Sequence, residues 1–191
     1  MAQLSQRTAA LRRIKPLYWA LAGLALAVLL PLPINDYYRA VLWTMGIYML
    51  LGLGLNIIVG YAGLFQLGHA AFYALGAYTA ALLNLKLGVP LLATVPAAII
   101  VAGLAGFIIS RPILHLRGDY LAIVTIAFGE IIRMLLVNNV GGVTGGSNGL
   151  FGVEPIELFG FRFTSALSNY YLVLFFVALT IFAINRLENS R

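Results

Sequence analysis

The sequence predicts an all-α, polytopic membrane protein with about six transmembrane helices in a single domain that covers residues 1–191. Hydrophobic residues make up 62% of the chain and charged residues only 9%. A soluble domain needs a larger polar fraction to cover its core. The apolar runs are continuous and close to the ~20 residues that a spanning helix needs, so we expect helices rather than the short alternating strands of a barrel.

The first apolar run, 17–34, follows a basic N-terminus that has arginine and lysine but no acidic residue before position 16. This run is long for a signal peptide and ends in Pro31 and Pro33 without a small-residue cleavage site, so we interpret it as an uncleaved first span. The later apolar runs predict five further spans. The six predicted spans are 17–34, 38–59, 64–85, 91–109, 120–137 and 169–184.

The basic residues predict the orientation of these spans. Most arginines and lysines flank the span ends that lie on the same side as the N-terminus. Positive charge marks the cytoplasmic side, so we expect a cytoplasmic N-terminus. The net charge of +6 would suggest nucleic acid for a soluble protein, but here the charges lie beside apolar spans, so the expected partner is the lipid bilayer. The chain has no cysteine, and we expect no disulfide and no metal site.

The third predicted span, within GLFQLGHAAFYALGAYTAAL, carries polar side chains at helical spacing. Gln66, His69 and Tyr73 recur at three- and four-residue steps with Gly76 and Ala80, so a helix would place them on one face. Polar groups are costly in lipid, so this face should point into protein or a water-filled cavity. Two interpretations stay open: hydrogen bonding between helices, and the border of a permeation route.

Glycine and alanine predict close helix packing on both sides of this span. The preceding segment GLGLNIIVGYAG lacks the strand and the third glycine of a nucleotide-binding fingerprint. Helix packing, or a broken helix beside a cavity, is the better interpretation. In the fourth span, Ala98, Ala102 and Gly106 recur at every fourth residue and predict a packing face.

The fifth predicted span carries Glu130 and Arg133 near its middle. Their spacing places both side chains on the same side of a helix. Because charges facing hydrocarbon are costly, we expect the two side chains to pair and to face inward. A structural ion pair that orients the helix and a direct role in gating or in the permeation path both stay open.

The long external loop, 138–168, opens with NNVGGVTGGSNGLFGV. It lacks the Gly-Lys-Ser/Thr ending of a phosphate-binding loop, so we expect no ATP site in this chain. Thr144, Gly145, Gly146 and Asn148 are candidate contacts for an external binding protein, and an ordinary tight loop is the alternative. No nucleophile with a base and no pair of inward carboxylates is evident, so we expect neither an enzyme nor a bound cofactor.

Three motifs in order, GLNIIVGYAGLFQLGHAAFYALGAYTAALL, RGDYLAIVTIAFGEIIR and NNVGGVTGGSNGL, resemble the permeases of branched-chain amino-acid ABC importers, specifically the LivM-like subunit. The resemblance runs from Gly52 to Leu150 and continues more loosely into the last span. Family members continue beyond the point where this sequence ends, with a cytoplasmic coupling helix and further spans. The resemblance therefore implies a permease domain that is incomplete at its C-terminus.

The resemblance also implies a location and partners. We expect a multi-pass protein of a bacterial or archaeal plasma (inner) membrane, assembled with a homologous LivH-like permease and two cytoplasmic ATPase subunits. An external solute-binding protein would deliver leucine, isoleucine, valine or a related small solute. The polar side chains of the third and fifth spans would then lie at the interior of a two-permease assembly.

Two other functions are compatible with the residues. One is an ion-coupled carrier or channel in which Glu130 titrates, although the adjacent Arg133 argues against it because a paired carboxylate resists protonation. The other is a membrane assembly factor, or a truncated chain, that transports nothing. Such a protein would not require polar residues along an inward helix face.

Overall fold

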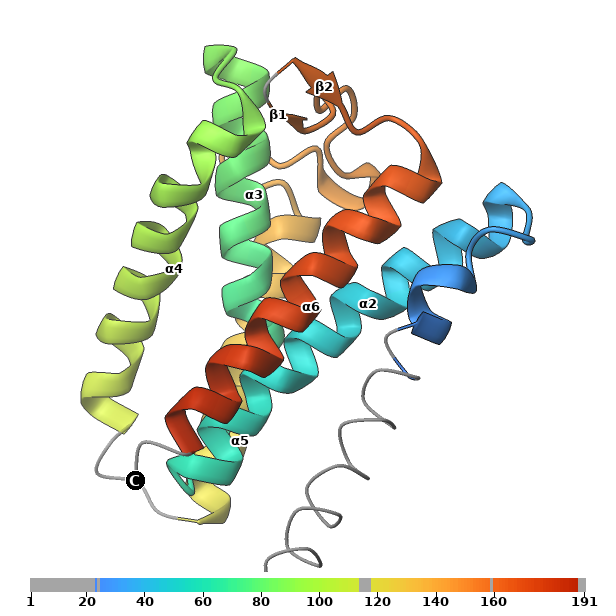
Figure 1. Cartoon of the computed structure of the whole chain (residues 1–191). Helices are drawn as coiled ribbons and strands as arrows, with labels where there is room; N and C mark the ends of the chain where they lie inside the picture. The colour runs from blue at the N-terminus through green and yellow to red at the C-terminus, as the bar shows by residue number, and fades with distance from the viewer. Residues whose placement is uncertain (1–22, 24, 114–117, 159, 189–191) are drawn as a thin grey trace, which may run out of the picture.

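The computed structural model describes residues 23, 25–113, 118–158 and 160–188, and most of them are helical (Figure 1). The long helices are α2 (Asp36–Asn56), α3 (His69–Leu87), α4 (Leu91–Ile113), α5 (Asp119–Val137) and α6 (Ala166–Glu188). A π-helical turn, η1 (Ile57–Tyr61), extends α2, and a 3₁₀ turn, η2 (Gly146–Asn148), lies in the long loop. Two short antiparallel strands, β1 (Glu157–Leu158) and β2 (Phe161–Arg162), form a hairpin before α6.

The polytopic helical class is confirmed. Among the described residues, four helical segments are long and apolar enough to cross a membrane, namely Asp36–Tyr61, Leu91–Arg111, Asp119–Val137 and Ala166–Glu188. The 19-residue α3 is not one of them, and His69, Asn84 and Lys86 make it less apolar than the others. Residues 17–22 and 24 of the first predicted span, 17–34, lie outside the described residues, so the number six stays a prediction.

The predicted start of the third span is wrong. Helix α3 begins at His69, and residues 63–68 are not helical. Gly63 has a φ of +64°, in the left-handed region that favours glycine and interrupts a right-handed helix. Gln66 therefore precedes the helix and does not share a helical face with His69 and Tyr73.

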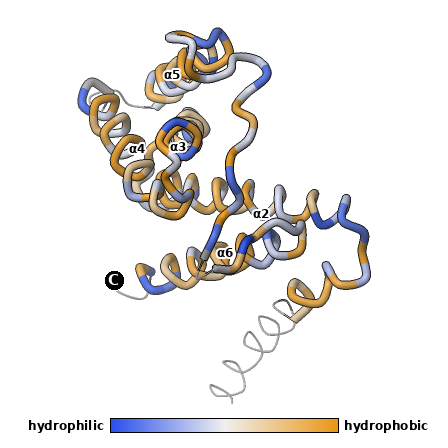
Figure 2. The backbone as a smooth tube through the Cα atoms, turned by 90° about the horizontal axis from the view of Figure 1, so that it is seen from above, coloured by the Kyte–Doolittle hydropathy of each residue, from blue (hydrophilic) through white to orange (hydrophobic). Residues whose placement is uncertain are grey.

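The helices pack in two groups that meet at α3. Helix α2 lies beside α6, and α3 lies beside α4 (Figure 1). Seen from above, α3 lies between α5 and the α2–α6 pair (Figure 2). Gly46 permits the α2–α6 contact, because a Cβ there would collide with Cγ1 of Val173.

The apolar core of the described part is small. Its buried hydrophobic residues are Ala71, Leu121, Ala122, Tyr170 and Ile184. By contrast, the outer face of α4 exposes Ile99, Leu104, Phe107 and Ile108, and hydropathic colouring shows apolar residues along the outside of this helix (Figure 2). An apolar surface of this extent calls for lipid or protein around it. The chain is therefore a membrane-embedded helical protein.

Tyrosines of α6 and an arginine of α2 hold the segment that precedes α2. The hydroxyl of Tyr170 donates to the carbonyl oxygen of Ala27 at 2.7 Å, and that of Tyr171 donates to Val28 at 3.0 Å. The guanidinium of Arg39 donates to the carbonyl oxygen of buried Pro31 at 2.8 Å. These bonds satisfy backbone carbonyls where the chain turns into α2.

Asn84 joins the end of α3 to the loop between α5 and α6. It is only 4% exposed, and its Nδ2 donates to the carbonyl oxygen of Val89 at 3.0 Å. Its Oδ1 accepts a hydrogen bond from the backbone N–H of Glu154 at 2.9 Å, across 70 residues of sequence. One buried amide thus satisfies backbone groups of two separate segments.

We expect Asn84→Ala to destabilise the protein by about 1–3 kcal/mol, because it leaves a backbone donor and a backbone acceptor without partners. Thermal unfolding of the detergent-solubilised protein measures this change. Asn148→Ala is the matched control, because Asn148 is exposed on the loop between α5 and α6. Equal unfolding temperatures for the two variants would contradict the proposed role of Asn84.

Candidate functional site

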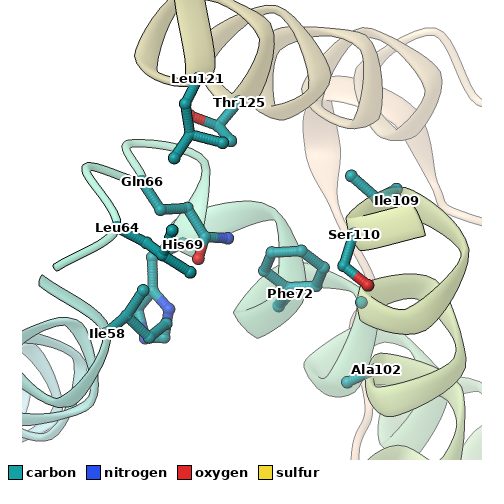
Figure 3. Close-up of a pocket in the computed structure, with 11 residues that line it drawn as sticks. Ile58, Leu64, Gln66, His69, Phe72, Ala102, Ile109, Ser110, Leu121 and Thr125 are labelled. Atoms are coloured by element: carbon teal, nitrogen blue, oxygen red, sulfur yellow. The ribbon is translucent and has the colours of Figure 1, made fainter. Parts of the chain in front are cut away.

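A cavity of about 310 Å³ lies beside the first turn of α3 (Figure 3). Its walls come from η1, the non-helical segment before α3, the C-terminal half of α4 and the N-terminal half of α5. The lining residues are Ile58, Leu64, Gln66, His69, Phe72, Ala102, Gly106, Ile109, Ser110, Leu121 and Thr125.

The interruption between α2 and α3 creates one wall of this cavity. After the π turn η1, the chain runs without helical structure to the buried Gly68. A Cβ on Gly68 would collide with the backbone carbonyl oxygen of Thr125, so glycine permits this close approach to α5. The backbone N–H of Leu67 also donates to Oγ1 of Thr125 at 3.1 Å. Thr125 itself is 4% exposed, so the start of α3 is held against a buried position of α5.

His69 has an unsatisfied polar atom. Its Nδ1 is buried and has no hydrogen-bond partner among the described residues. On its other side the ring packs against α2, where a Cβ on Gly54 would lie 3.0 Å from Nε2. Glycine at position 54 therefore lets the imidazole approach α2. A buried polar atom without a partner costs roughly 1–3 kcal/mol, so His69 is held here at an energetic cost.

Gln66 and Ser110 add hydrogen-bonding capacity on two walls. The carboxamide of Gln66 lies toward the interior of the cavity in Figure 3, and no partner for it is found within the described part of the chain. The hydroxyl of Ser110 donates to the carbonyl oxygen of Phe107 at 3.0 Å, which leaves its oxygen free to accept. No lining residue carries a formal charge at neutral pH when His69 is neutral. The cavity is thus largely apolar with a few neutral polar groups.

The predicted small-residue row of the fourth span is placed in part. Ala102 and Gly106 line the cavity, and a Cβ on Gly106 would lie 3.7 Å from Cε1 of Phe72 on α3. The Phe72 ring lies 5.5 Å from that of Phe128, between centroids, and so links α3 to α5. These positions therefore face α3, as the spacing predicts.

The structure separates the predicted polar residues of the third span. Gln66 and His69 line the cavity, whereas Tyr73 is 47% exposed and does not. The sequence interpretation also missed Ser110 and Thr125. Both are polar residues within predominantly apolar segments, and that signal could have identified them.

Glu130 and Arg133 pair as predicted. Nη2 of Arg133 lies 2.6 Å from Oε1 of Glu130, and Nε donates to Oε2 at 2.9 Å. The expectation that the pair faces inward is not met by this chain alone, because the side chains are 45% and 62% exposed, respectively. The buried residues of α5 are Leu121, Ala122 and Thr125, on its N-terminal half, so packing against α3 leaves the ion pair uncovered.

The pair lies in an open groove between α3 and α5 that shares no lining residue with the cavity. We call it the α3–α5 groove. Three alanines of α3 and one glycine of α5 lie among larger side chains. Its lining residues are Leu67, Ala70, Ala71, Ala74, Tyr78, Ile126, Gly129, Glu130, Ile132, Arg133, Leu136 and Val137.

The loop between α5 and α6 is tied to the end of α5. Thr144 is 7% exposed, and its hydroxyl donates to the carbonyl oxygen of Leu136 at 2.7 Å. Oδ1 of Asn139 accepts hydrogen bonds from the backbone N–H groups of Thr144 and Gly145. Gly145 and Gly146 have positive φ angles of 71° and 63°. Thr144 is therefore engaged within the loop, whereas contact of this loop with a binding protein stays a prediction.

We expect Glu130→Gln to lower the amount of folded protein in the membrane, because it removes the counter-charge of Arg133 inside an apolar helix. The double variant Glu130→Gln/Arg133→Met should recover part of that loss. Detergent extraction followed by size-exclusion chromatography measures both. Glu157→Gln is the matched control, since Glu157 pairs with Arg162 at 3.3 Å in the hairpin, where both side chains are exposed. If Glu130→Gln behaves like this control, the ion pair is not needed for folding.

Comparison with known proteins places the chain in a family. The family described as "Branched-chain amino acid transport system / permease component" matches residues 37–191. The high-affinity branched-chain amino acid transport system permease protein LivM of Escherichia coli (strain K12) is 42% identical over 197 residues, and that of Salmonella typhimurium (strain LT2) is 41% identical. Each alignment covers 91% of this chain and 46% of the relative, so the chain spans about half the length of these relatives. No solved structure matches it. The chain belongs to the family of branched-chain amino acid transport system permease components.

Proposed function

We propose that this chain is a transmembrane permease subunit of an ATP-driven importer for branched-chain amino acids or related small solutes. The observation that carries the proposal is the family match over residues 37–191, which runs from the second residue of α2 through the end of α6. The two relatives are named as permease proteins of high-affinity branched-chain amino acid transport systems. We infer the class of solute and the use of ATP for this chain from the family and from these two relatives.

The cavity supports a place in the translocation pathway. A solute that crosses the bilayer needs a wet or polar route, and polar groups within membrane helices mark such routes. Transporters commonly place substrate sites at interrupted helices, where backbone groups and helix ends become available to a solute. The interruption between η1 and α3, with Gln66 and His69 beside it, has this character.

The distribution of basic residues supports a cytoplasmic N-terminus in a bacterial or archaeal plasma (inner) membrane. In that orientation the junction between η1 and α3 lies on the cytoplasmic side, and the loop between α5 and α6 lies outside. The cavity would then open in the inner half of the bilayer. The external loop would be available to a solute-binding protein.

The proposed assembly contains a homologous permease, two cytoplasmic ATPase subunits and an external solute-binding protein. The sequence lacks a phosphate-binding loop, so ATP hydrolysis is assigned to the ATPase subunits. We place the homologous permease on the α3–α5 groove. An exposed ion pair is costly against hydrocarbon, and small residues at Ala70, Ala74 and Gly129 allow another helix to approach closely.

The geometry of the Glu130–Arg133 ion pair tests the alternative function, an ion-coupled carrier. Both carboxylate oxygens of Glu130 are hydrogen-bonded to Arg133. A carboxylate committed to a bidentate partner is poorly suited to pick up and release a proton. We therefore favour ATP-driven import over proton coupling.

We expect leucine uptake into proteoliposomes that contain the assembled transporter and its binding protein to require ATP. Radiolabelled leucine, with and without ATP, measures this. An assembly whose ATPase subunits cannot hydrolyse ATP is the control and should not take up leucine. Uptake that follows a proton gradient and ignores ATP would contradict the proposal and favour the carrier.

We expect a cysteine at position 126 to be protected from a membrane-permeant maleimide when the homologous permease is present. Ile126 lines the α3–α5 groove and is 50% exposed in the chain alone. The sequence contains no cysteine, so a single introduced thiol gives an unambiguous signal. Ile99→Cys is the matched control, because Ile99 is 66% exposed on the outer face of α4. Equal labelling of Ile126→Cys with and without the homologous permease would show that the groove is not the interface.

A further inference from the structure

We infer that the cavity beside the first turn of α3 is a solute-binding site for a small aliphatic amino acid. The apolar side chain would lie between α4 and α5, and the carboxylate would lie toward Gln66 and the start of α3. The inference rests on the proposed function, since it assumes that an amino acid passes through this chain. It adds a location, an orientation and a basis for size selection.

The apolar part of the cavity suits a short aliphatic side chain. Leu64, Ile109 and Leu121 come from three different segments and surround the same space, with Phe72 beside them (Figure 3). The volume of about 310 Å³ is at the lower end of the ~300–1,000 Å³ that is typical of small-molecule sites. The volume is therefore sufficient for a single amino acid.

The polar part of the cavity suits a carboxylate at one wall. Nδ1 of His69 is buried without a partner, and the carboxamide of Gln66 has none within the described residues. The N-cap residue of α3 is Gly68, which has no side chain to cap the first N–H groups. Such groups lack partners within the helix, and the helix dipole there favours negative charge. A carboxylate at this wall could accept hydrogen bonds from the carboxamide of Gln66 and from the first N–H groups of α3.

The remaining wall suits the ammonium end. The oxygen of Ser110 is free to accept a hydrogen bond, and in Figure 3 it lies across the cavity from Gln66. Because no formal charge lines the cavity when His69 is neutral, a net ion would be buried without a counter-charge. A zwitterion, whose two charges cancel, is the better match. The geometry therefore points to an intact amino acid rather than to an inorganic ion or an amine.

The test is to narrow the cavity by one methyl group. Gly106→Ala fits the backbone, because the added Cβ lies 3.7 Å from Phe72, an ordinary contact, at a position that lines the cavity. Gly103→Ala is the matched control on the same helix, since an added Cβ there meets nothing within 4 Å. Both variants are measured in the assembled transporter with the same binding protein, so a difference between them does not arise from external selection.

We expect Gly106→Ala to lower the ratio of leucine uptake to valine uptake by about tenfold, the discrimination that one methylene typically gives in an apolar pocket. Gly103→Ala should leave the ratio unchanged. An unchanged ratio in Gly106→Ala, or an equal loss of both solutes, would overturn the site. If the unmodified assembly takes up neither leucine nor valine, the proposed function fails and the site fails with it.

A second variant tests the polar wall. Gln66→Met keeps the length of the side chain and removes its hydrogen-bonding groups. Loss of a hydrogen bond to a charged group should raise the KM for leucine about tenfold or more, with ATP hydrolysis by the assembly retained. A KM equal to that of the unmodified protein would remove Gln66 from the site and contradict the proposed orientation.

Discussion

The close approach of Gly68 to the backbone of Thr125 is the contact on which the candidate site depends. It joins the start of α3 to a buried position of α5, where no side chain could be accommodated. The hydrogen bond from Leu67 to Thr125 holds the preceding segment in place. Because this segment cannot continue α2 or begin α3 as a helix, it forms a wall of the cavity and carries Gln66 to it. The interruption between α2 and α3, the Gly68–Thr125 contact and the cavity therefore depend on one another.

The Glu130–Arg133 ion pair, in contrast to the polar residues of the cavity, is a polar group that this chain does not bury. Glu130 and Arg133 satisfy each other, yet they remain exposed in the α3–α5 groove. Few hydrophobic residues are buried, and most apolar side chains of α4 face outward. Such a surface is stable only when lipid or protein surrounds it. The described helices thus need surroundings that their own packing does not supply.

Local spacing predicted some features well and long-range contacts decided others. The Glu130–Arg133 pair follows from three residues of separation on one helix, and the Ala102–Gly106 face follows from helical periodicity. The position of Gln66 does not follow from local spacing. It depends on the hydrogen bond between Leu67 and Thr125, which are 58 residues apart. The prediction that Tyr73 shares a helical face with Gln66 and His69 assumed that one helix carries all three residues. The local sequence pattern also could not predict the hydrogen bond by which Asn84 joins two segments 70 residues apart.

The sequence by itself determined that this is a helical membrane protein, and its motifs identified the permease family. Those properties follow from composition and short-range order, since hydrocarbon requires long apolar helices and internally satisfied backbone groups. Only the tertiary structure decided which polar side chains share a cavity and which lie in an open groove. That choice depends on where glycine lets two backbones meet, and such contacts join residues far apart in the chain.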